Sequence, residues 1–331
     1  MKRIKTAAVF LMALSMLVCA ACSKGGNAED INVGGNWNRP LTFVCIFAAG
    51  GDTDYNGRLL AKYLEKEIGQ NIICTNVTGG NGAVALTQYK DMKPDNCTFL
   101  VACSSTLGGN YASGMMDFSY EAYDPVAIFG CSSGETILVA ADSPYKTLED
   151  LVTASQENPG KIIFGSSTGG ASYLASYSVL CSKYNAKFGL VDGSGGAERL
   201  TALLGGHVDV TNTALMNCKD YIDTGVLRPI ATLTSNSPAA YPDIATACSV
   251  YPEMIQDNYY VLLALKGTSP DTIEAMNKAI ANVVNGNEQY REEYKKTNLQ
   301  DAMVMSVAET DEELKKETEH YLKLADIMKE Q

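Results

Sequence analysis

The stretch Phe47-Ala48-Ala49-Gly50-Gly51-Asp52-Thr53-Asp54 constrains the fold of this chain more than any other feature. It follows an apolar run, 41–47, and precedes a segment with helical periodicity, 58–68. This order predicts a strand, a glycine-rich turn and the start of a helix. Glycine allows a tight turn and close approach to a ligand, and the first amides of a helix point outward with partial positive charge. The loop is therefore suited to holding an anion.

The first 21 residues have the pattern of an export signal. Three basic residues within the first five precede an apolar run, 7–18, and a pair of small residues stands before Cys22. A cysteine at that place resembles the lipidation site of bacterial lipoproteins. We therefore predict that residues 1–21 are a lipoprotein signal peptide and that Cys22 becomes the lipidated first residue. The apolar run is shorter than the roughly 20 residues of a membrane-spanning helix, which disfavours an uncleaved anchor.

Charge and location limit the partners of the mature chain. Residues 22–36 are interpreted as a flexible tether, so the protein is expected to be exported and lipid-anchored at the outer face of the cell membrane or in the periplasm. Removing residues 1–21 takes away three of 26 basic residues and none of 38 acidic ones, which changes the net charge from −12 to −15. Nucleic acid is not expected to bind so acidic a chain. An anionic ligand must be held by local dipoles in a cleft.

Cysteine spacing argues against a metal or redox site. Besides Cys19 and Cys22 the chain has eight cysteines, with no C-x-x-C pair and no adjacent histidine, so no metal or other cofactor is expected. Several lie in apolar runs, where cysteine behaves as a small buried hydrophobe. The eight are Cys45, Cys74, Cys97, Cys103, Cys131, Cys181, Cys218 and Cys248.

Short apolar runs alternate with helical segments along the chain, which is typical of parallel α/β sheets. Helix starts are predicted at Thr147 and Thr310, which head capping-box-like sequences, and at Pro270. Residues 37–331 form a longer segment than a single hydrophobic core usually stabilises, so two domains are expected. The predicted strands are 41–47, 71–77, 98–103, 161–165, 188–191, 207–211 and 228–233.

Five of the segments that follow these strands are rich in glycine or small polar residues. In open α/β sheets, ligands bind at the carboxyl ends of strands. One such loop would be an ordinary turn, but five at the same end of the strands predict a binding cleft. The five loops are 48–54, 78–83, 104–109, 166–172 and 192–196.

The order and spacing of a longer series of motifs make the chain resemble a known protein family. The motifs are Arg39-Pro40-Leu41, Phe47-Ala-Ala-Gly-Gly-x-x-Asp54, Arg58-Leu59-Leu60-Ala61, Gly69-Gln70, Asn76-x-x-Gly-Gly-Asn-Gly82, Tyr123-Asp124-Pro125-Val126, Asn158-Pro159-Gly160-Lys161, Gly165-Ser-Ser167, Leu203-Leu-Gly-Gly-x-Val-Asp209 and Gly225-x-Leu-Arg228-Pro. Over essentially its whole mature length, the chain resembles the substrate-binding proteins of tripartite tricarboxylate transporters, the Bug or TctC-like family.

The resemblance implies an α/β fold of the two-lobed periplasmic-binding-protein type (type II). Each lobe would contain a mostly parallel sheet flanked by helices, with the ligand cleft between the lobes. We expect residues 37–138 to form the N-terminal part of lobe 1 and residues 139–255 to form lobe 2. Residues 256–331 would return to lobe 1 and add its C-terminal helices.

The resemblance also implies a ligand site. In that family the lobes close on a small carboxylate, which loops grip largely through backbone amides. Carried onto this chain, lobe 1 would contribute Phe47, Ala49, Gly51, Asp54, Asn81 and Ser104. Lobe 2 would contribute Ser166, Ser167, Thr168, Gly169, Gly195, Asp209 and Asn212.

Some residues near that site depart from the family pattern. Tyr173 stands where a histidine is frequent, and Asp192 begins a run that replaces a Pro-Tyr-Lys-like one. Asp52 and Asp192 would add negative charge near an anion site, which predicts a ligand with an amino group, such as an acidic amino acid. The alternative is that Asp52 or Asp54 caps a helix that starts near Tyr55.

Two arginines lie near the predicted loops and could bind a carboxylate through paired N–H groups. For Arg58, one turn into its helix, a structural salt bridge is favoured. Arg199 stands just after the fifth loop, within reach of a ligand, and is included in the site together with Asp52 and Tyr173.

A catalytic alternative comes from Gly165-Ser-Ser-Thr-Gly169, which matches the G-x-S-x-G nucleophile motif between a strand and a helix. Ser167 would be the nucleophile of a serine hydrolase. Only His207 and His320 could serve as its base, and their predicted positions suit a catalytic triad poorly. No catalytic residue is therefore assigned.

Together, these interpretations predict that the protein is an extracytoplasmic solute-binding lipoprotein without catalytic activity. It would capture a small carboxylate, either a di- or tricarboxylate or an acidic amino acid, by lobe closure. As a monomer, attached to the membrane through the lipid on Cys22, it would deliver this ligand to the membrane subunits of a tripartite tricarboxylate-type transporter. An alternative of a different class is a ligand-sensing module for a membrane sensor kinase.

Overall fold

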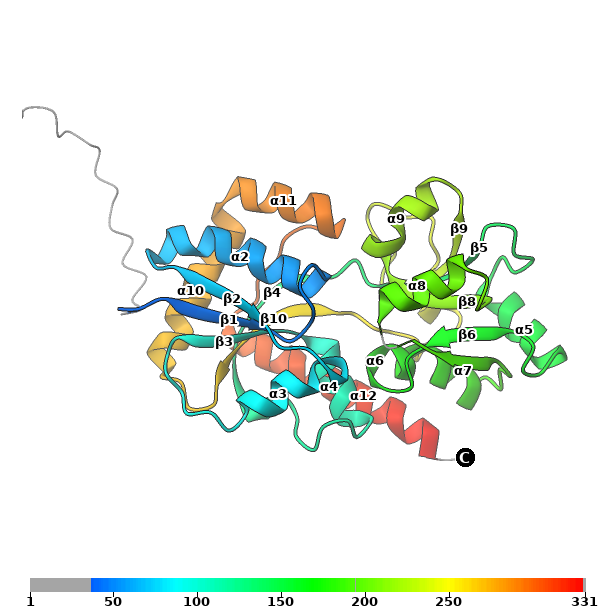
Figure 1. The fold of residues 1–331 in the computed structure, drawn as a ribbon, viewed down its shortest axis with the longest axis horizontal. Helices are drawn as coiled ribbons and strands as arrows, with labels where there is room; N and C mark the ends of the chain where they lie inside the picture. The colour runs from blue at the N-terminus through cyan, green and yellow to red at the C-terminus, as the bar shows by residue number, and fades with distance from the viewer. Residues whose placement is uncertain (1–36, 194, 330–331) are drawn as a thin grey trace, which may run out of the picture. The chain divides into compact units, whose positions relative to one another are not determined.

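The chain folds around two five-stranded sheets. The computed structural model describes residues 37–193 and 195–329, and Figure 1 labels their helices and strands. The predicted signal peptide, the tether and Cys22 lie outside the described residues. Within the described residues, no helix is both long and apolar enough to cross a membrane.

The first sheet combines strands from both ends of the chain. Its strands are β1 (Leu41–Cys45), β2 (Ile72–Asn76), β3 (Thr98–Cys103), β4 (Tyr123–Cys131) and β10 (Tyr259–Leu265). Their order is β2-β1-β3-β10-β4. β1 runs parallel to β2 and β3, whereas β10 runs antiparallel to β3 and β4.

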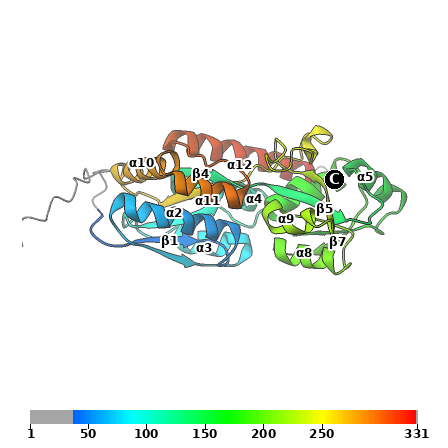
Figure 2. The same ribbon diagram turned by 90° about the horizontal axis from the view of Figure 1, so that it is seen from above.

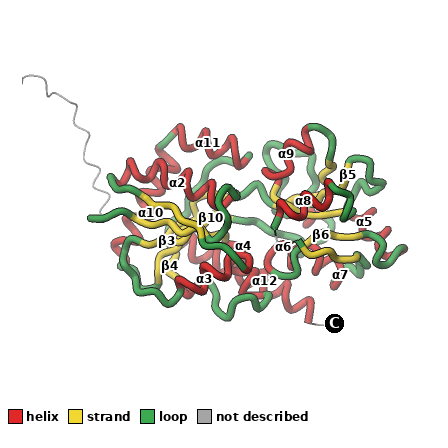
Figure 3. The backbone as a smooth tube through the Cα atoms, viewed as in Figure 1, coloured by secondary structure: helices red, strands yellow, loops and turns green. Residues whose placement is uncertain are grey.

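The second sheet repeats this arrangement, and Figure 3 shows the strands gathered in two separate groups. Its strands are β5 (Glu135–Ala140), β6 (Ile163–Ser166), β7 (Gly189–Asp192), β8 (Val210–Ala214) and β9 (Leu227–Thr232). Their order is β7-β6-β8-β5-β9. β6 runs parallel to β7 and β8, whereas β5 runs antiparallel to β8 and β9.

Each sheet therefore has one reversed strand, β10 or β5, and is otherwise parallel, as predicted. β4, β5 and β10 were not among the predicted strands. β4 and β5 follow each other with only residues 132–134 between them, so the expected alternation of strand and helix does not apply there. The expected lobe boundary at 138 falls inside β5, which begins at Glu135.

Different helices cover the two faces of the first sheet (Figure 1). One face carries α2 (Asp52–Ile68), α10 (Pro270–Gly286) and α11 (Glu288–Asn298), and the other carries α3 (Ala83–Tyr89), α4 (Ser104–Ala112) and α12 (Val307–Lys329). Successive strand residues point to opposite faces, so Phe43 packs in the first core and Val44 in the second. The near-continuous apolar strands follow from burial on both faces.

The second sheet is also covered on both faces. One face carries α5 (Leu148–Glu157), α6 (Gly170–Tyr173), the π-helix η3 (Leu174–Ser178) and α7 (Val179–Ser182), and the other carries α8 (Gly196–Leu204) and α9 (Leu215–Asp223). Leu138 and Val139 are neighbours on β5 and belong to different cores. Both faces of β5 are thus buried.

Two of the predicted helix starts are confirmed. Thr147 and Asp150 form a capping box at the start of α5, with Asp150 N donating to Thr147 Oγ1 at 3.1 Å. α10 begins at Pro270, and the side chain of its N-cap, Ser269, accepts a hydrogen bond from Thr272 N.

The predicted start of the last helix was wrong. α12 begins at Val307, before Thr310. Ser306 and Glu309 exchange the hydrogen bonds of the cap there, since each side chain accepts a bond from the other residue's backbone N–H. Thr310 Oγ1 instead accepts a hydrogen bond from Ile128 N of β4 at 2.9 Å.

α12 packs on both sheets, and Figure 2 shows it extending from one to the other. Leu314 lies in a core of the first sheet, whereas Tyr321 and Leu324 are buried in a core of the second. α4 approaches α12 closely at Gly108, where an added Cβ would lie 2.8 Å from Tyr321 Cδ2. The C-terminal half of α12 therefore packs with lobe 2, although the segment 256–331 was expected to belong to lobe 1.

Gly130 of β4 is predicted to be required for packing against α11. An added Cβ would lie 2.8 Å from Cε2 and Cζ of the fully buried Tyr294 ring. We expect Gly130→Ala to lower the free energy of unfolding by roughly 1–3 kcal/mol, because the ring has no room to move. Gly286→Ala, at the open end of α10, is the control and should be neutral or stabilising by up to about 1 kcal/mol. Urea titration measures both, and equal effects would contradict the packing argument.

Candidate functional site

The carboxyl ends of β1, β2 and β3 meet at one edge of the first sheet, because the three strands are parallel neighbours. The glycine-rich loop leaves β1 at this edge, and its residues 48–51 are exposed. α2 begins at Asp52 after the N-cap Gly51, and no side chain caps it. The alternative that Asp52 or Asp54 caps a helix starting near Tyr55 was therefore wrong. The N-terminus of α2 faces the exposed loop, as an anion site requires.

Asp54 holds this loop in place. The residue is 3% exposed, and its carboxylate accepts hydrogen bonds from Gly50 N at 2.9 Å, Arg58 Nε at 2.9 Å and Asn76 Nδ2 at 2.7 Å. Asn76 also donates to Phe47 O at 2.9 Å, which ties the loop to the end of β2. Burial alone would raise the pKa of Asp54, but the bond from Arg58, together with the others, lowers it overall. The structural salt bridge predicted for Arg58 is confirmed.

Asp52 lies beside the loop in a different environment. One of its oxygens accepts a hydrogen bond from Thr53 N at 2.8 Å, and the other lies 3.4 Å from Tyr260 Oη on β10. Burial raises the pKa of Asp52, and the negative charge of Glu135 on β5 adds to the rise, against the bond from Thr53. The carboxylates of Asp52 on α2 and Glu135 on β5 therefore interact, although the two elements pack on different sheets.

Two more predicted residues of lobe 1 are held by neighbours. Asn81, with φ of 50°, donates from Nδ2 to Asn110 Oδ1 at 3.0 Å, and Asn110 donates back to Asn81 O at 2.9 Å. A Cβ added to Gly170 of α6 would lie 2.7 Å from Asn81 Nδ2, so this loop contacts the other lobe. Ser104, the first residue of α4, is buried, and its Oγ accepts from Tyr259 N at 3.0 Å.

The loop after β6 forms the corresponding edge of the second sheet. Ser166 is fully buried, and its Oγ has no hydrogen-bond partner among the described residues. Ser167 Oγ donates to Gly169 O at 3.0 Å, which closes the loop on itself. Gly169 is the N-cap of α6, and the next residue, Gly170, has a φ of 78° and donates its N–H at 3.3 Å to the Oγ of Ser113, the C-cap of α4. The glycine pair thus allows the turn to approach lobe 1.

Glu135 is a candidate residue that the sequence analysis missed. It is the first residue of β5 and pairs with Ala214 at the carboxyl end of β8, so it lies at the edge where the predicted loops leave the sheet. Its carboxylate accepts hydrogen bonds from Ser172 Oγ at 2.7 Å, from Arg199 NH2 at 3.3 Å and from Asn212 Nδ2. A charged residue directly before an apolar run was the available signal, but β5 itself was not predicted.

Arg199 forms its hydrogen bonds with Glu135 and with backbone oxygens close to it. It is 4% exposed, and it also donates to Asn212 O at 2.8 Å and to Gly193 O at 3.3 Å. Its guanidinium is therefore shared between the loop after β7, the end of β8 and Glu135. Two of the predicted ligand residues, Arg199 and Asn212, converge on a carboxylate that belongs to the protein.

The structure does not bring every predicted residue to this edge. Asp209 lies at the amino end of β8, where its Oδ2 accepts from Ile163 N at 2.8 Å. Its position is roughly 10 Å along β6 from Ser166, given the rise of a strand. Tyr173 stacks on Tyr177, with ring centroids 5.7 Å apart, beside the core of lobe 2. The other predicted residues of lobe 2 do lie at or next to the loops that follow β6 and β7: Thr168, Asp192 and Gly195.

The geometry does not favour a hydrolase. Ser167 donates its hydroxyl hydrogen to Gly169 O, His207 is exposed, and His320 on α12 bonds to Ile255 O at 3.0 Å. In residues 37–193 and 195–329, no cluster of three or more acidic, histidine or cysteine side chains could hold a metal ion. All eight cysteines there are unpaired thiols.

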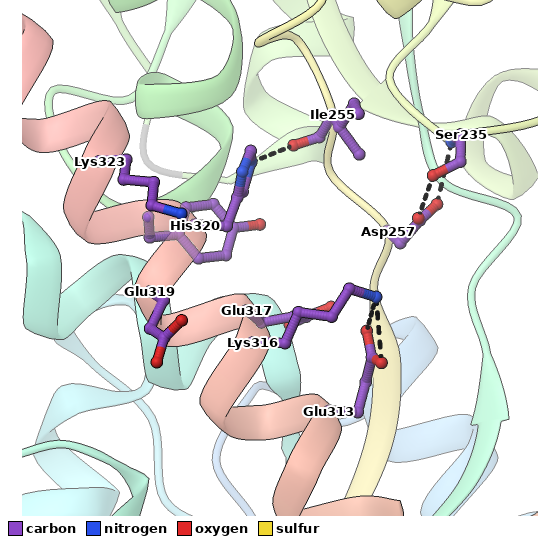
Figure 4. A pocket seen from close by; sticks show the side chains of 10 residues that line it. Ser235, Ile255, Asp257, Glu313, Lys316, Glu317, Glu319, His320 and Lys323 are labelled. Atoms are coloured by element: carbon purple, nitrogen blue, oxygen red, sulfur yellow. Dashed lines mark hydrogen bonds and ion pairs between the residues drawn. The ribbon is translucent and has the colours of Figure 1, made fainter.

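A cavity of about 330 Å³ lies elsewhere, between α12 and the segments that precede β10 (Figure 4). None of the predicted site residues lines it. Its polar side chains bond mainly to near neighbours, such as Lys316 to Glu313 and Ser235 to Asp257. Burial raises the pKa of Glu317 well above its usual range. These features suit the packing of α12 better than capture of an anion.

Asp52 is predicted to reduce the stability of the unliganded protein. Because its pKa is raised on folding, its ionised form opposes folding, and this cost appears as the pH rises from the unfolded pKa through the folded one. We expect Asp52→Asn to raise the free energy of unfolding at pH 7 by on the order of 1 kcal/mol. The gain should shrink toward pH ~4, where the unfolded carboxyl titrates.

Asp54→Asn is the matched control, with the opposite sign at pH 7, because the pKa of Asp54 is lowered on folding. Urea titrations at both pH values measure the two variants. A loss of stability in Asp52→Asn at pH 7 would contradict the assigned cost.

Comparison with known proteins places this geometry in a family. Residues 57–323 match the family described as tripartite tricarboxylate transporter family receptor, TctC. A protein of Cupriavidus necator, named for the gbd 5' region, is 28% identical over 249 residues, which cover 73% of each chain. BugT of Bordetella pertussis is 25% identical over 249 residues, covering 73% of this chain and 75% of that protein.

Solved structures show the same fold. The periplasmic binding protein BugD has a TM-score of 0.74 at 22% identity and covers 88% of this chain and 99% of its own. MatC of Rhodopseudomonas palustris, solved with bound malate, has a TM-score of 0.75 at 22% identity and covers 87% of this chain and 99% of its own. The two-lobed α/β architecture and the family match agree, and the matched family is one of receptors rather than enzymes. The chain belongs to the TctC family of tripartite tricarboxylate transporter receptors.

Proposed function

We propose that this protein is an extracytoplasmic solute-binding lipoprotein that captures a small carboxylate between its lobes and delivers it to a tripartite tricarboxylate-type membrane transporter. The ligand would be a di- or tricarboxylate or an acidic amino acid. The observation that carries the proposal is the exposed loop 48–51, held rigid by Asp54 in front of the N-terminus of α2. Such a loop binds a carboxylate through backbone N–H groups and the helix dipole.

Local dipoles suit a strongly acidic protein. With a net charge of −12, the whole chain repels anions at long range, so attraction must arise within the site. Asp54 holds the loop that provides this attraction, and its own negative charge is offset by hydrogen bonds from Arg58, Gly50 and Asn76. The loop is thus fixed before the ligand arrives, and little conformational entropy is lost on binding.

Lobe 2 would complete the site on closure. The loop 166–170 and Glu135 stand at the edge of the second sheet, and Gly170 already contacts Asn81 and Ser113 of lobe 1. α12 packs in both lobes, so closure would turn about this helix as well as about the strand connections. Rpa4515 of R. palustris was solved with adipate and MatC with malate, which supports a carboxylate ligand here.

The proposed site is tested by thermal unfolding of residues 23–331 against mono-, di- and tricarboxylates and amino acids. A ligand at a hundredfold over its Kd stabilises the folded state by roughly 2.7 kcal/mol, which should raise the Tm by about 5 °C. The protein should first be unfolded and refolded to remove any carried ligand. No shift with any compound would contradict the carboxylate assignment.

Variants locate the site. Asp54→Asn should weaken the binding detected in this panel at least tenfold, because it releases the loop. Asp95→Asn is the matched control: Asp95 also pairs with an arginine, Arg39, and accepts two backbone N–H bonds, but it precedes β3 at the opposite end of the strand. Binding that falls equally in both variants would reflect general destabilisation and argue against this site.

We also propose that Cys22 carries the lipid that holds the protein at the outer face of the cell membrane or in the periplasm. The support is the signal-like sequence before it. Expressed in a bacterium fed an alkyne fatty acid, the full chain should incorporate the label and sediment with membranes. Cys22→Ser should do neither, whereas Cys19→Ser should behave as the unmodified chain. Equal labelling of the Cys22→Ser variant would rule out this attachment site.

A further inference from the structure

Glu135 engages two of the predicted ligand residues of lobe 2, Arg199 and Asn212. Its carboxylate accepts from Ser172 Oγ, Arg199 NH2 and Asn212 Nδ2. Arg199 also donates to the backbone oxygens of Asn212 and Gly193. A carboxylate of a ligand could reach these donors only by displacing Glu135, which would then be left as an unpaired charge beside it.

The polar atoms left over at this edge can accept hydrogen bonds. Asn212 is fully buried, and since its Nδ2 is bonded to Glu135, its Oδ1 has no partner in the described part of the chain. Ser166 Oγ, on the neighbouring strand β6, is also fully buried and unpartnered among those residues. Asn212 and Glu135 share one face of the sheet, because Asn212 pairs with Ile137 on β5. Buried oxygens without a donor cost free energy, which a ligand that brings N–H groups would recover.

Lobe 1 adds a second carboxylate within electrostatic range. Asp52, at the start of α2, interacts with the charge of Glu135, and Tyr260 Oη of β10 lies 3.4 Å from its Oδ2. The loop of lobe 1 offers N–H groups to an anion, whereas the Asp52 carboxylate and Asn212 Oδ1, which lies beside Glu135, favour a cation. The two halves of the site therefore favour opposite charges.

We propose that Glu135 makes this receptor selective for a ligand that carries an ammonium group as well as a carboxylate, that is, an amino acid, over the carboxylate of the same skeleton without the amino group. This inference rests on the proposed function, since it assigns the charge pattern of the same ligand. The glycine-rich loop holds the ligand carboxylate. The ammonium lies against Glu135, with Asn212 Oδ1 as a second acceptor.

A second carboxylate on the ligand gains little from lobe 2. Arg199 is 4% exposed and ion-paired with Glu135, so the two charges offset each other. Asp52 has no ion pair among the described residues, so the charge left over at the site is negative. A dicarboxylate such as succinate would bring its second charge toward Glu135 and Asp52. A charge-assisted hydrogen bond is worth about tenfold or more in affinity, so the ammonium should dominate the discrimination.

Calorimetric titration of the mature protein, lacking only the lipid, tests this with matched pairs that differ in the ammonium group alone. The pairs are L-aspartate and succinate, L-glutamate and glutarate, and L-alanine and propionate. We expect the amino member of the pair that fits the cleft to bind at least tenfold more tightly. The unmodified protein suffices for this measurement, so the result does not depend on the folding of a variant.

Glu135→Gln then identifies the residue responsible. It keeps an acceptor for Ser172 but frees the charge of Arg199, so the preference for the amino member should fall at least tenfold and the dicarboxylate should gain affinity. Glu157→Gln removes one exposed charge at the end of α5 and should leave the preference unchanged. If Glu135→Gln folds poorly because Arg199 is left buried and unpaired, Glu135→Gln with Arg199→Gln removes both charges and should show the same loss of preference.

The outcomes separate this inference from the proposed function. Tighter binding of succinate or glutarate than of its amino partner would overturn the inference and leave the carboxylate receptor intact. A preference for the amino member that survives in the Glu135 variants would overturn the role of Glu135. Binding of no compound in any pair, and of no member of the wider panel, would overturn the proposed function and the inference with it.

Discussion

The carboxylate of Asp54 is the interaction on which the proposed site depends. It joins Gly50, Arg58 and Asn76, so it fixes the exit of β1, the first turn of α2 and the end of β2 relative to one another. A loop of small residues would otherwise sample many conformations. Held in this way, it presents backbone N–H groups beside a helix N-terminus without any free basic side chain, which allows a strongly acidic protein to bind an anion.

The reversed strands explain how two similar sheets provide different chemistry. β5 and β10 run against their neighbours, so their first residues stand at the same edges as the loops that end the parallel strands. In lobe 1 this places Tyr260 against Asp52, and in lobe 2 it places Glu135 against Arg199 and Asn212. The charges that the proposed ligand should carry are thus set by residues at or beside the starts of β5 and β10 as well as by the glycine-rich loops.

The sequence predicted the α/β class, the two mostly parallel sheets, the glycine loops and several helix starts, because hydrophobic periodicity and caps are local signals. It did not predict β4, β5, β10 or the start of α12. β4 and β5 are apolar runs that follow one another, and Thr310 makes a tertiary contact with β4 while Ser306 and Glu309 cap α12. Asp209 was assigned to the site by the resemblance alone, yet it lies at the amino end of β8 and accepts a hydrogen bond from Ile163 N at the start of β6. Glu135 escaped notice because its partners are distant in sequence.

Hydrogen exchange, followed by mass spectrometry with and without the carboxylate that gives the largest thermal shift, tests the central claim most directly. The account predicts that backbone amides of 48–54 in lobe 1 and of 166–171 in lobe 2 slow together on binding, because both loops close on one ligand. Protection of one loop only, or protection confined to the α12 cavity, would contradict a site between the lobes.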